Sequence, residues 1–279
     1  MLPFTDWLLE PLSYEFMQRG MAAAVLVGII CAVVGTYVIL RGMAFFGDAL
    51  AHTILPGIAL GYLVSGGARD TLFWWALGTA VTAALGIGAV SRRAQVREDT
   101  AIGIIFAGMF ALGIALISTV HSYAVDLSHF LFGDVLGVSS QSLWLILIFG
   151  GLVLLTIAAF YKEFLILSFD PILAVTLRLP AGLLNNLFLT LIAVTVAVSL
   201  QTVGVALMVA MLVTPPATAY LLTHRLPSMM GLAAFFAAFS GVVGLYLSYY
   251  LSIASGAAIV LTATAIFLLA FLWKHFRRI

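Results

Sequence analysis

The stretch RGMAFFGDALAHTILPGIALGYLVS, residues 41–65, carries two ionisable side chains in a segment apolar enough to cross a lipid bilayer. An aspartate at the centre of a bilayer costs about 2.5–3.5 kcal/mol on insertion scales, so it seldom lies there without a partner or a function. Asp48 and His52 are four residues apart. On a helix this spacing places them on one face, one turn apart, so both side chains can reach the same point.

A proline follows this pair by one helical turn. Pro56 has no N–H, and its ring crowds the carbonyl of His52, so we expect a kink or a break in this helix. The segment thus offers a carboxylate, an imidazole and a backbone carbonyl without its helical hydrogen bond, all facing one point. Such a set is typical of an ion site, and Asp48 and His52 are its candidate metal ligands. The alternative is a structural pair, in which the two side chains bind each other or a neighbouring helix.

The composition excludes a soluble protein. The 279 residues are 64% hydrophobic and 8% charged, whereas soluble domains carry about 25% charged residues. The net charge of +1, without a basic patch beyond short loops, gives no sign of nucleic-acid binding. Cys31 is the single cysteine, which excludes a disulfide within the chain and a metal site built from cysteines.

Apolar runs of about 20 residues, each able to cross a hydrocarbon core of ~30 Å, follow one another along the chain. They predict an all-α membrane protein with eight or nine spans in a single domain, residues 1–279. Residues 1–19 combine acidic and aromatic side chains and are expected to lie on the outer surface of the membrane. The sixth and seventh runs could instead form one long broken hairpin. The predicted spans are 20–40, 44–65, 71–91, 101–121, 141–161, 183–200, 203–223, 228–250 and 255–273.

Lys and Arg are distributed unevenly between the two sets of loops. One set holds ten of them and the other holds Arg19 and Arg69 only. Because loops rich in Lys and Arg remain in the cytoplasm, the C-terminus is predicted to be cytoplasmic and the N-terminus external. The ten are Arg41, Arg92, Arg93, Arg97, Lys162, Arg178, Arg225, Lys274, Arg277 and Arg278.

The outer loop and the seventh span also carry candidate functional residues. In the outer loop, Asp126 and His129 are three residues apart and could form an outer gate or receive a cation, although a solvated loop that contacts a partner is an alternative. In the seventh span, Pro215 and Pro216 are expected to interrupt the helix. These predictions rest on residue type and spacing alone.

The cytoplasmic segment 162–182 is too polar to span the membrane. Asp170 and Pro171 are a helix-start signal, with the aspartate as N-cap and the proline as first helical residue. A short amphipathic helix is expected to run to about Leu179. Such a helix, with Arg178 near its end, could dock another protein or lie on the inner leaflet.

Four stretches together resemble the membrane permease subunit of bacterial metal-ion ABC importers, the manganese, zinc and iron family. They occur in the family's order and the likeness covers nearly the whole chain. One departure is Pro216, where the family's pattern has alanine. The stretches are ILRGMAFFGDALAHTILPGIALG (39–61), VDLSHFLFGDVLGV (125–138), SFDPILAVTLRLP (168–180) and QTVGVALMVAMLVTPPATAYLL (201–222).

The resemblance implies a homodimer of permeases in the inner membrane of a bacterium, cytoplasmic ATPase subunits and an external solute-binding protein that delivers the metal. It assigns the translocation ligands to Asp48 and His52, and ATPase docking to the helix that begins at Asp170. The chain has no GxxxxGK[ST] motif, so we expect a transport subunit that is not itself an enzyme and depends on ATP hydrolysis elsewhere.

The candidate ligands are a hard oxygen and a borderline nitrogen, which suit Mn²⁺, Fe²⁺ or Zn²⁺. The run LVTPPATAYLLT, residues 212–223, resembles the manganese and iron members more than the zinc members. Manganese is therefore the favoured cargo, and no permanently bound cofactor is expected. The alternatives are a permease for a metal chelate and a proton-coupled secondary transporter. An intramembrane metalloprotease is disfavoured, because the chain has no HExxH pattern.

Overall fold

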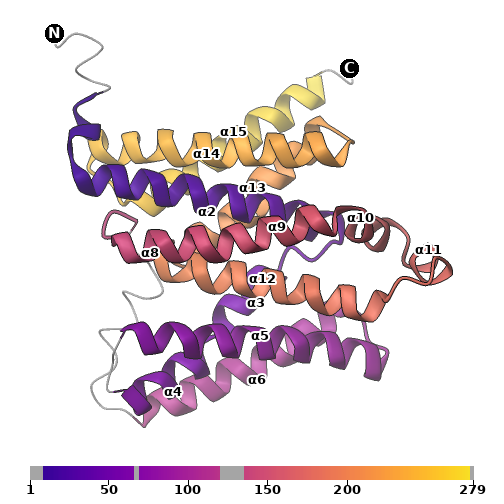
Figure 1. Cartoon of the computed structure of the whole chain (residues 1–279). Coiled ribbons are helices and arrows are strands. Elements are labelled where there is room, and N and C mark those ends of the chain that lie inside the picture. Colours follow the sequence, from indigo (N-terminus) through magenta and orange to yellow (C-terminus); the bar gives the residue numbers. More distant parts are fainter. Residues whose placement is uncertain (1–8, 66–68, 120–134, 277–279) are drawn as a thin grey trace. The chain divides into compact units, whose positions relative to one another are not determined.

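The computed structural model describes residues 9–65, 69–119 and 135–276, and every regular element in these ranges is a helix (Figure 1). Nine helical segments of this described part are long and apolar enough to cross a membrane, which confirms the predicted polytopic all-α class. The elements are η1 (Pro11–Ser13), α2 (Glu15–Leu40), α3 (Phe46–Thr53), α4 (Leu55–Ser65), α5 (Arg69–Ala94), α6 (Glu98–Ser118), α8 (Ser140–Leu145), η2 (Ile146–Gly150), α9 (Gly151–Ala159), α10 (Tyr161–Phe169), α11 (Pro171–Thr176), α12 (Ala181–Val203), α13 (Val205–Leu222), α14 (Leu226–Leu251) and α15 (Ser255–Phe276).

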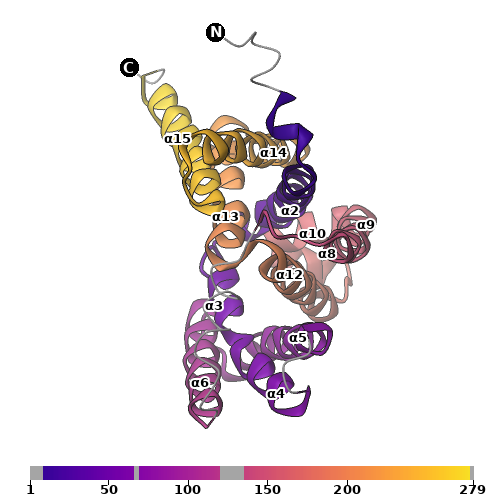
Figure 2. The same cartoon turned by 90° about the vertical axis from the view of Figure 1, so that its left-hand side faces the viewer.

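The helices gather into two compact units that alternate along the sequence. The first unit contains residues 1–36, 129–151 and 202–279, and in it α13, α14 and α15 pack against one another. The second unit contains residues 37–128 and 152–201, and in it α3, α4, α5 and α6 form a bundle (Figure 2). Because Asp48 and His52 lie on α3, the second unit holds the candidate ion site.

The sixth and seventh spans are separate helices. α12 ends at Val203 and α13 begins at Val205, with only Gly204 between them. Gly204 has φ +79° and ψ 171°, a backbone conformation that side chains with a Cβ seldom adopt and that glycine adopts readily. The chain therefore ends one helix and starts the next within a single residue.

The prediction that Pro215 and Pro216 interrupt the helix is wrong, because α13 continues through both prolines to Leu222. Pro216 cannot donate a hydrogen bond to the carbonyl of Leu212, four residues earlier. Gly35 of α2 lies directly against this carbonyl, and a Cβ on Gly35 would also lie 2.9 Å from Cγ of Pro216. Glycine lets the two helices approach closely here, as small residues commonly do between membrane helices.

This contact predicts that Gly35→Ala lowers the stability of the protein. The new methyl group would overlap the Leu212 carbonyl, and forcing extra atoms into a packed interior costs about 1–3 kcal/mol. The matched control is Gly231→Ala in α14, where a Cβ meets nothing within 4 Å. The thermal unfolding midpoint in detergent should fall for Gly35→Ala and hold or rise for Gly231→Ala. Equal midpoints for Gly35→Ala and the wild type would contradict this account of the proline-containing helix.

Candidate ion-binding site

A tight turn between α2 and α3 sets the position of Asp48. The N–H of Gly42 donates to the carbonyl of Ile39 at 3.1 Å, and the N–H of Met43 donates to the carbonyl of Val38 at 2.9 Å. Gly42 has φ +69°, so this is the glycine-ended helix terminus that pairs the last carbonyls of a helix. The N–H of Phe46 then donates to the carbonyl of Met43 at 2.9 Å and starts α3. Asp48 thus lies in the first turn of α3.

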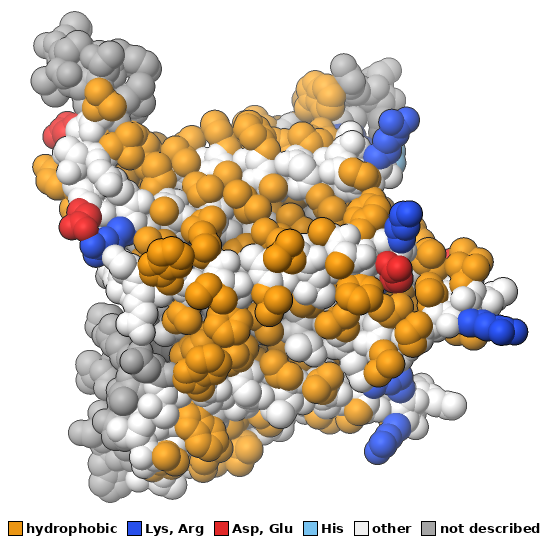
Figure 3. Space-filling view, in the orientation of Figure 1, with side chains coloured by type: hydrophobic (Ala, Val, Ile, Leu, Met, Phe, Trp, Pro, Cys, Tyr) orange, Lys and Arg blue, Asp and Glu red, His pale blue; other side chains and the backbone are white. Residues whose placement is uncertain are grey.

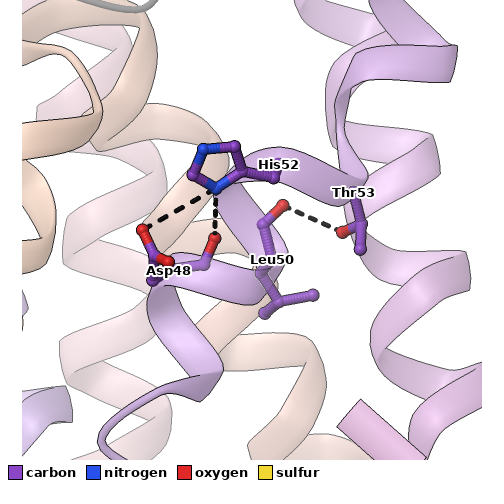
Figure 4. A network of polar contacts seen from close by, with 4 residues as sticks. All are labelled: Asp48, Leu50, His52 and Thr53. Atoms are coloured by element: carbon purple, nitrogen blue, oxygen red, sulfur yellow. Dashed lines mark hydrogen bonds and ion pairs between the residues drawn. The ribbon is translucent and has the colours of Figure 1, made fainter. Parts of the chain in front are cut away.

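Asp48 and His52 lie together on one face of α3, as their spacing predicts (Figure 4). Nδ1 of His52 is 2.9 Å from the backbone carbonyl of Asp48 and 3.7 Å from its carboxylate oxygen Oδ1. Because a carbonyl only accepts hydrogen bonds, Nδ1 donates to it, and the neutral imidazole then keeps a free lone pair on Nε2. Figure 4 shows this second ring nitrogen directed away from Asp48.

The spacing of the carboxylate and the imidazole is compatible with one shared ion. The distance of 3.7 Å between Nδ1 and Oδ1 is too long for a hydrogen bond. Metal bonds to carboxylate oxygen and imidazole nitrogen are about 2.1 Å each, so two such atoms reach one ion when they are less than about 4.2 Å apart. Binding through Nδ1 would require this nitrogen to give up its proton and its carbonyl partner. The metal-ligand role of the pair stays a prediction.

Two phenyl rings of α6 enclose the imidazole of His52. Phe106 and Phe110 contact it edge to face, with ring centroids 5.8 Å and 5.7 Å from that of His52. The two phenyl rings stack on each other at 5.8 Å. This apolar wall restricts the orientation of the imidazole while the His52 side chain stays 29% exposed and that of Asp48 34% exposed. This wall was not predicted, although two phenylalanines four residues apart on the fourth span were a signal for it.

The backbone next to the pair differs little from a helix. α3 ends at Thr53 and α4 begins at Leu55, but Ile54 between them keeps helical angles, φ −71° and ψ −21°. A break caused by Pro56 is therefore not confirmed, and the His52 carbonyl as a third ligand stays a prediction. Gly57 holds this region against α5, since a Cβ there would lie 2.5 Å from the carbonyl of Trp75 and overlap the hydroxyl of Thr79.

The described residues add no third side-chain ligand of this kind to the pair. Asp126 and His129 lie outside the described residues. Within residues 9–65, 69–119 and 135–276, no group of three or more His, Cys, Asp or Glu side chains is placed to hold a metal ion. The described part of one chain therefore offers two side-chain ligands at the site.

The segment 162–182, which is predicted to be cytoplasmic, forms the expected short helix, but the helix ends earlier than expected. The Asp170 carboxylate accepts the N–H of Leu173 at 2.9 Å and caps α11, and Pro171 is its first residue. α11 ends at Thr176, about three residues before the predicted end, because Arg178 takes the left-handed conformation with φ +57°. Ala174 of α11 is buried, whereas four larger apolar side chains of α11 and its C-cap are exposed: Ile172, Leu173, Val175 and Leu177.

Charge and hydrophobic surface are separated in the second unit. Lys and Arg side chains gather at the end where α10 and α11 lie, and hydrophobic side chains cover much of the helices beyond them (Figure 3). This pattern is typical of a membrane protein whose basic end remains in the cytoplasm. The orientation of the termini stays a prediction.

Comparison with known proteins identifies the family. Residues 13–274 match the ABC 3 transport family. The manganese transport system membrane protein MntC of Halalkalibacterium halodurans is 48% identical over 263 residues, which are 94% of this chain and 89% of that protein. A probable iron transport system membrane protein of Haemophilus influenzae is 38% identical over 272 residues, 98% of each chain.

A solved structure supports the same assignment. PsaBC from Streptococcus pneumoniae in complex with Fab matches with a TM-score of 0.82 and 37% identity, over 96% of this chain and 95% of that chain. These matches confirm the resemblance to permease subunits of metal-ion ABC importers. The chain belongs to the ABC 3 transport family.

Proposed function

We propose that the chain is the membrane-spanning permease of an ATP-driven importer for a divalent transition metal, with Mn²⁺ favoured over Fe²⁺ and Zn²⁺. The observation that carries this proposal is the placement of Asp48 and His52 together on α3, part of an apolar membrane-spanning segment. Ionisable groups inside a span are costly, and they commonly mark the path of an ion. The pair would bind the cargo transiently during its passage.

The donor atoms and the relatives both favour manganese. A carboxylate suits hard cations such as Mn²⁺, an imidazole suits several transition metals, and the pair contains no thiolate that would select Zn²⁺. Relatives named for manganese transport range from 48% to 38% identity, and the relatives named for iron transport are 38% identical. Iron and zinc differ from manganese too little in these donors to be excluded by chemistry alone.

The site is incomplete within one described chain, which suits a transporter. Two side-chain ligands leave most positions of a six-coordinate ion to waters, backbone carbonyls or a second permease, and we propose a homodimer. A cargo must bind well enough to enter and weakly enough to leave. A full cage of protein ligands would hold the ion too tightly for rapid passage.

The energy source would be a cytoplasmic ATPase subunit that docks on α11. This helix presents exposed apolar side chains, with Ile172 80% and Val175 66% exposed, and Asp170 caps its start. Apolar side chains exposed beside a basic end are suited to a protein partner rather than to water. An external solute-binding protein would deliver the metal to the opposite side of the membrane.

We predict that Asp48→Ala abolishes metal accumulation. Cells starved of metals and then supplied with Mn²⁺, Fe²⁺ and Zn²⁺ together should gain manganese when they express the whole transporter. Cells that express the Asp48→Ala transporter should gain no more manganese than cells that lack the transporter. The variant should still co-purify with the ATPase. The matched control is Asp99→Ala, which removes an exposed carboxylate. Elemental mass spectrometry measures all three metals at once.

Each other result of this uptake experiment has a clear meaning. Normal manganese uptake by Asp48→Ala would remove this carboxylate from the mechanism. A rise of iron or zinc alone would keep the importer and change the cargo. If no metal rises with the intact transporter, a chelate permease or a proton-coupled carrier becomes the better proposal.

We also predict that the purified permease binds Mn²⁺ through this pair. Asp48→Asn and His52→Gln keep the size of each side chain and remove a negative charge or an imidazole. Each should weaken binding by at least about 10–100-fold, since even indirect partners of metal ligands have effects of this size. The controls are Asp99→Asn and His224→Gln, which change exposed side chains. Unchanged Mn²⁺ titration curves for both site variants would contradict the assignment.

A third prediction concerns the ATPase. Asp170→Ala removes the cap of α11, a change that costs about 0.5–2 kcal/mol of helix stability, and Arg178→Ala removes the cation that follows it. The double variant should retain less ATPase in a pull-down than the wild type does. The double variant Arg97→Ala with Asp99→Ala is the charge-matched control, because it deletes one exposed Arg and one exposed Asp. Equal ATPase recovery from both double variants would count against docking at α11.

A further inference from the structure

Arg41 joins the two segments that flank α11. Its Nε donates to Oγ of Ser168 at 3.1 Å, and its Nη1 donates to Oδ1 of Asn185 at 2.8 Å. Ser168 lies at the end of α10, just before α11, and Asn185 lies near the start of α12, just after it (Figure 1). One guanidinium therefore holds both sides of the helix that is proposed to dock the ATPase.

The contacts of Arg41 belong to a larger cluster of aromatic and hydrogen-bonded side chains. Its guanidinium carbon lies 4.0 Å from the centre of the Phe188 ring, a favourable cation–π arrangement. Phe188 also contacts Tyr37 and Phe164, with ring centroids 5.9 Å and 5.7 Å away. Ser168 connects Arg41 to Phe164, because its hydroxyl accepts from Arg41 and donates to the carbonyl of Phe164 at 2.7 Å. The cluster thus ties α2, α10 and α12 together at one end of the second unit.

Arg41 is charged and incompletely satisfied in this arrangement. Burial lowers its pKa to about 10, so the guanidinium stays protonated at neutral pH, and the nearby carboxylate of Glu98 opposes the shift. Its Nη2 is buried without a hydrogen-bond partner among the described residues. A charged donor left without a partner is unfavourable, and such groups in native structures call for an explanation. A second arrangement in which Nη2 gains a partner would provide one.

The same residue is connected to the ion site by a short turn. Arg41 directly follows α2, and residues 41–45 separate α2 from α3. The turn is held by backbone hydrogen bonds from Met43 to Val38 and from Phe46 to Met43, both 2.9 Å. A displacement of Arg41 would therefore be carried to α3, and with it to Asp48 and His52, rather than absorbed by a loose loop.

We propose that Arg41 is a positioning residue that transmits movement of α11 to the Asp48–His52 pair, so that events at the docked ATPase change the ion site. This inference rests on the proposed function. The planar fork of arginine is needed because it donates in two directions at once, to α10 and to α12, while it stacks on an aromatic ring. A lysine at this position could keep the charge but not these three contacts together.

The test compares transport with ATP hydrolysis in the same sample. The permease–ATPase complex is reconstituted in liposomes, and Mn²⁺ uptake is measured per ATP hydrolysed. In Arg41→Gln and Arg41→Lys this ratio should fall by about fivefold or more, the lower range for coupled sites. Arg97→Gln is the control, because Arg97 has an 88% exposed side chain that pairs with Asp99 at 3.7 Å, and it should keep the wild-type ratio.

A second set of variants tests the route. Ser168→Ala combined with Asn185→Ala removes both acceptors and should reproduce the ratio of Arg41→Gln. Adding Arg41→Gln to this double variant should lower the ratio no further. If Arg41 only supported the fold, uptake and hydrolysis would decline together in all of these variants and their ratio would stay constant.

The outcomes separate this inference from the proposed function. If the wild-type complex takes up no Mn²⁺ while it hydrolyses ATP, the proposed function fails. If the wild type and Arg97→Gln couple uptake to hydrolysis and both Arg41 variants keep the wild-type ratio, the inference fails and the proposed function stands. Loss of assembly in Arg41→Gln leaves the decision to Arg41→Lys and to the double variant, which retain the cation.

Discussion

The constraint that governs this protein is that polar groups inside a bilayer must find partners within the protein. Long helices meet this demand for the backbone, and glycines stand at two of the positions where the helix pattern changes. Gly35 approaches the Leu212 carbonyl that Pro216 leaves without a donor. Gly204 ends one helix and starts the next within one residue. Asp48 and His52 are ionisable side chains inside a predicted span, and each has the other as a neighbour.

Most of the fold could be predicted from the sequence, because each membrane span needs about 20 apolar residues and therefore leaves a strong local signal. Predictions were wrong where a distant residue or an uncommon backbone conformation decides where a helix bends or ends. A proline pair ordinarily disturbs a helix, but the effect of Pro216 depends on a glycine about 180 positions earlier. The end of α11 depends on the left-handed conformation of Arg178. Arginine seldom adopts this conformation, so the residue type does not predict it.

The candidate site was predictable in part for the same reason. The spacing of Asp48 and His52 is a property of one helix, so the sequence reveals it directly. The wall formed by Phe106 and Phe110 depends on how α6 packs on α3, and phenylalanine is common in membrane spans. Arg41 has its partners, Ser168 and Asn185, more than 120 residues away in the sequence. Hydropathy and spacing therefore give no sign of these partners. Local pattern therefore predicts candidate ligands better than it predicts the residues proposed to position them.

This difference between candidate ligands and proposed positioning residues fits the demands of the proposed transport. A pair of ligands can bind an ion, but the same pair must bind well on one side of the membrane and poorly on the other. Such a change requires that the geometry of the pair depend on the state of another site, which is a coupling free energy between the two sites. In the second unit, the short turn from Arg41 to α3 is fixed by hydrogen bonds at both ends. A two-ligand site on a helix attached to such a turn can change its affinity through small displacements, whereas a rigid cage of many ligands could not.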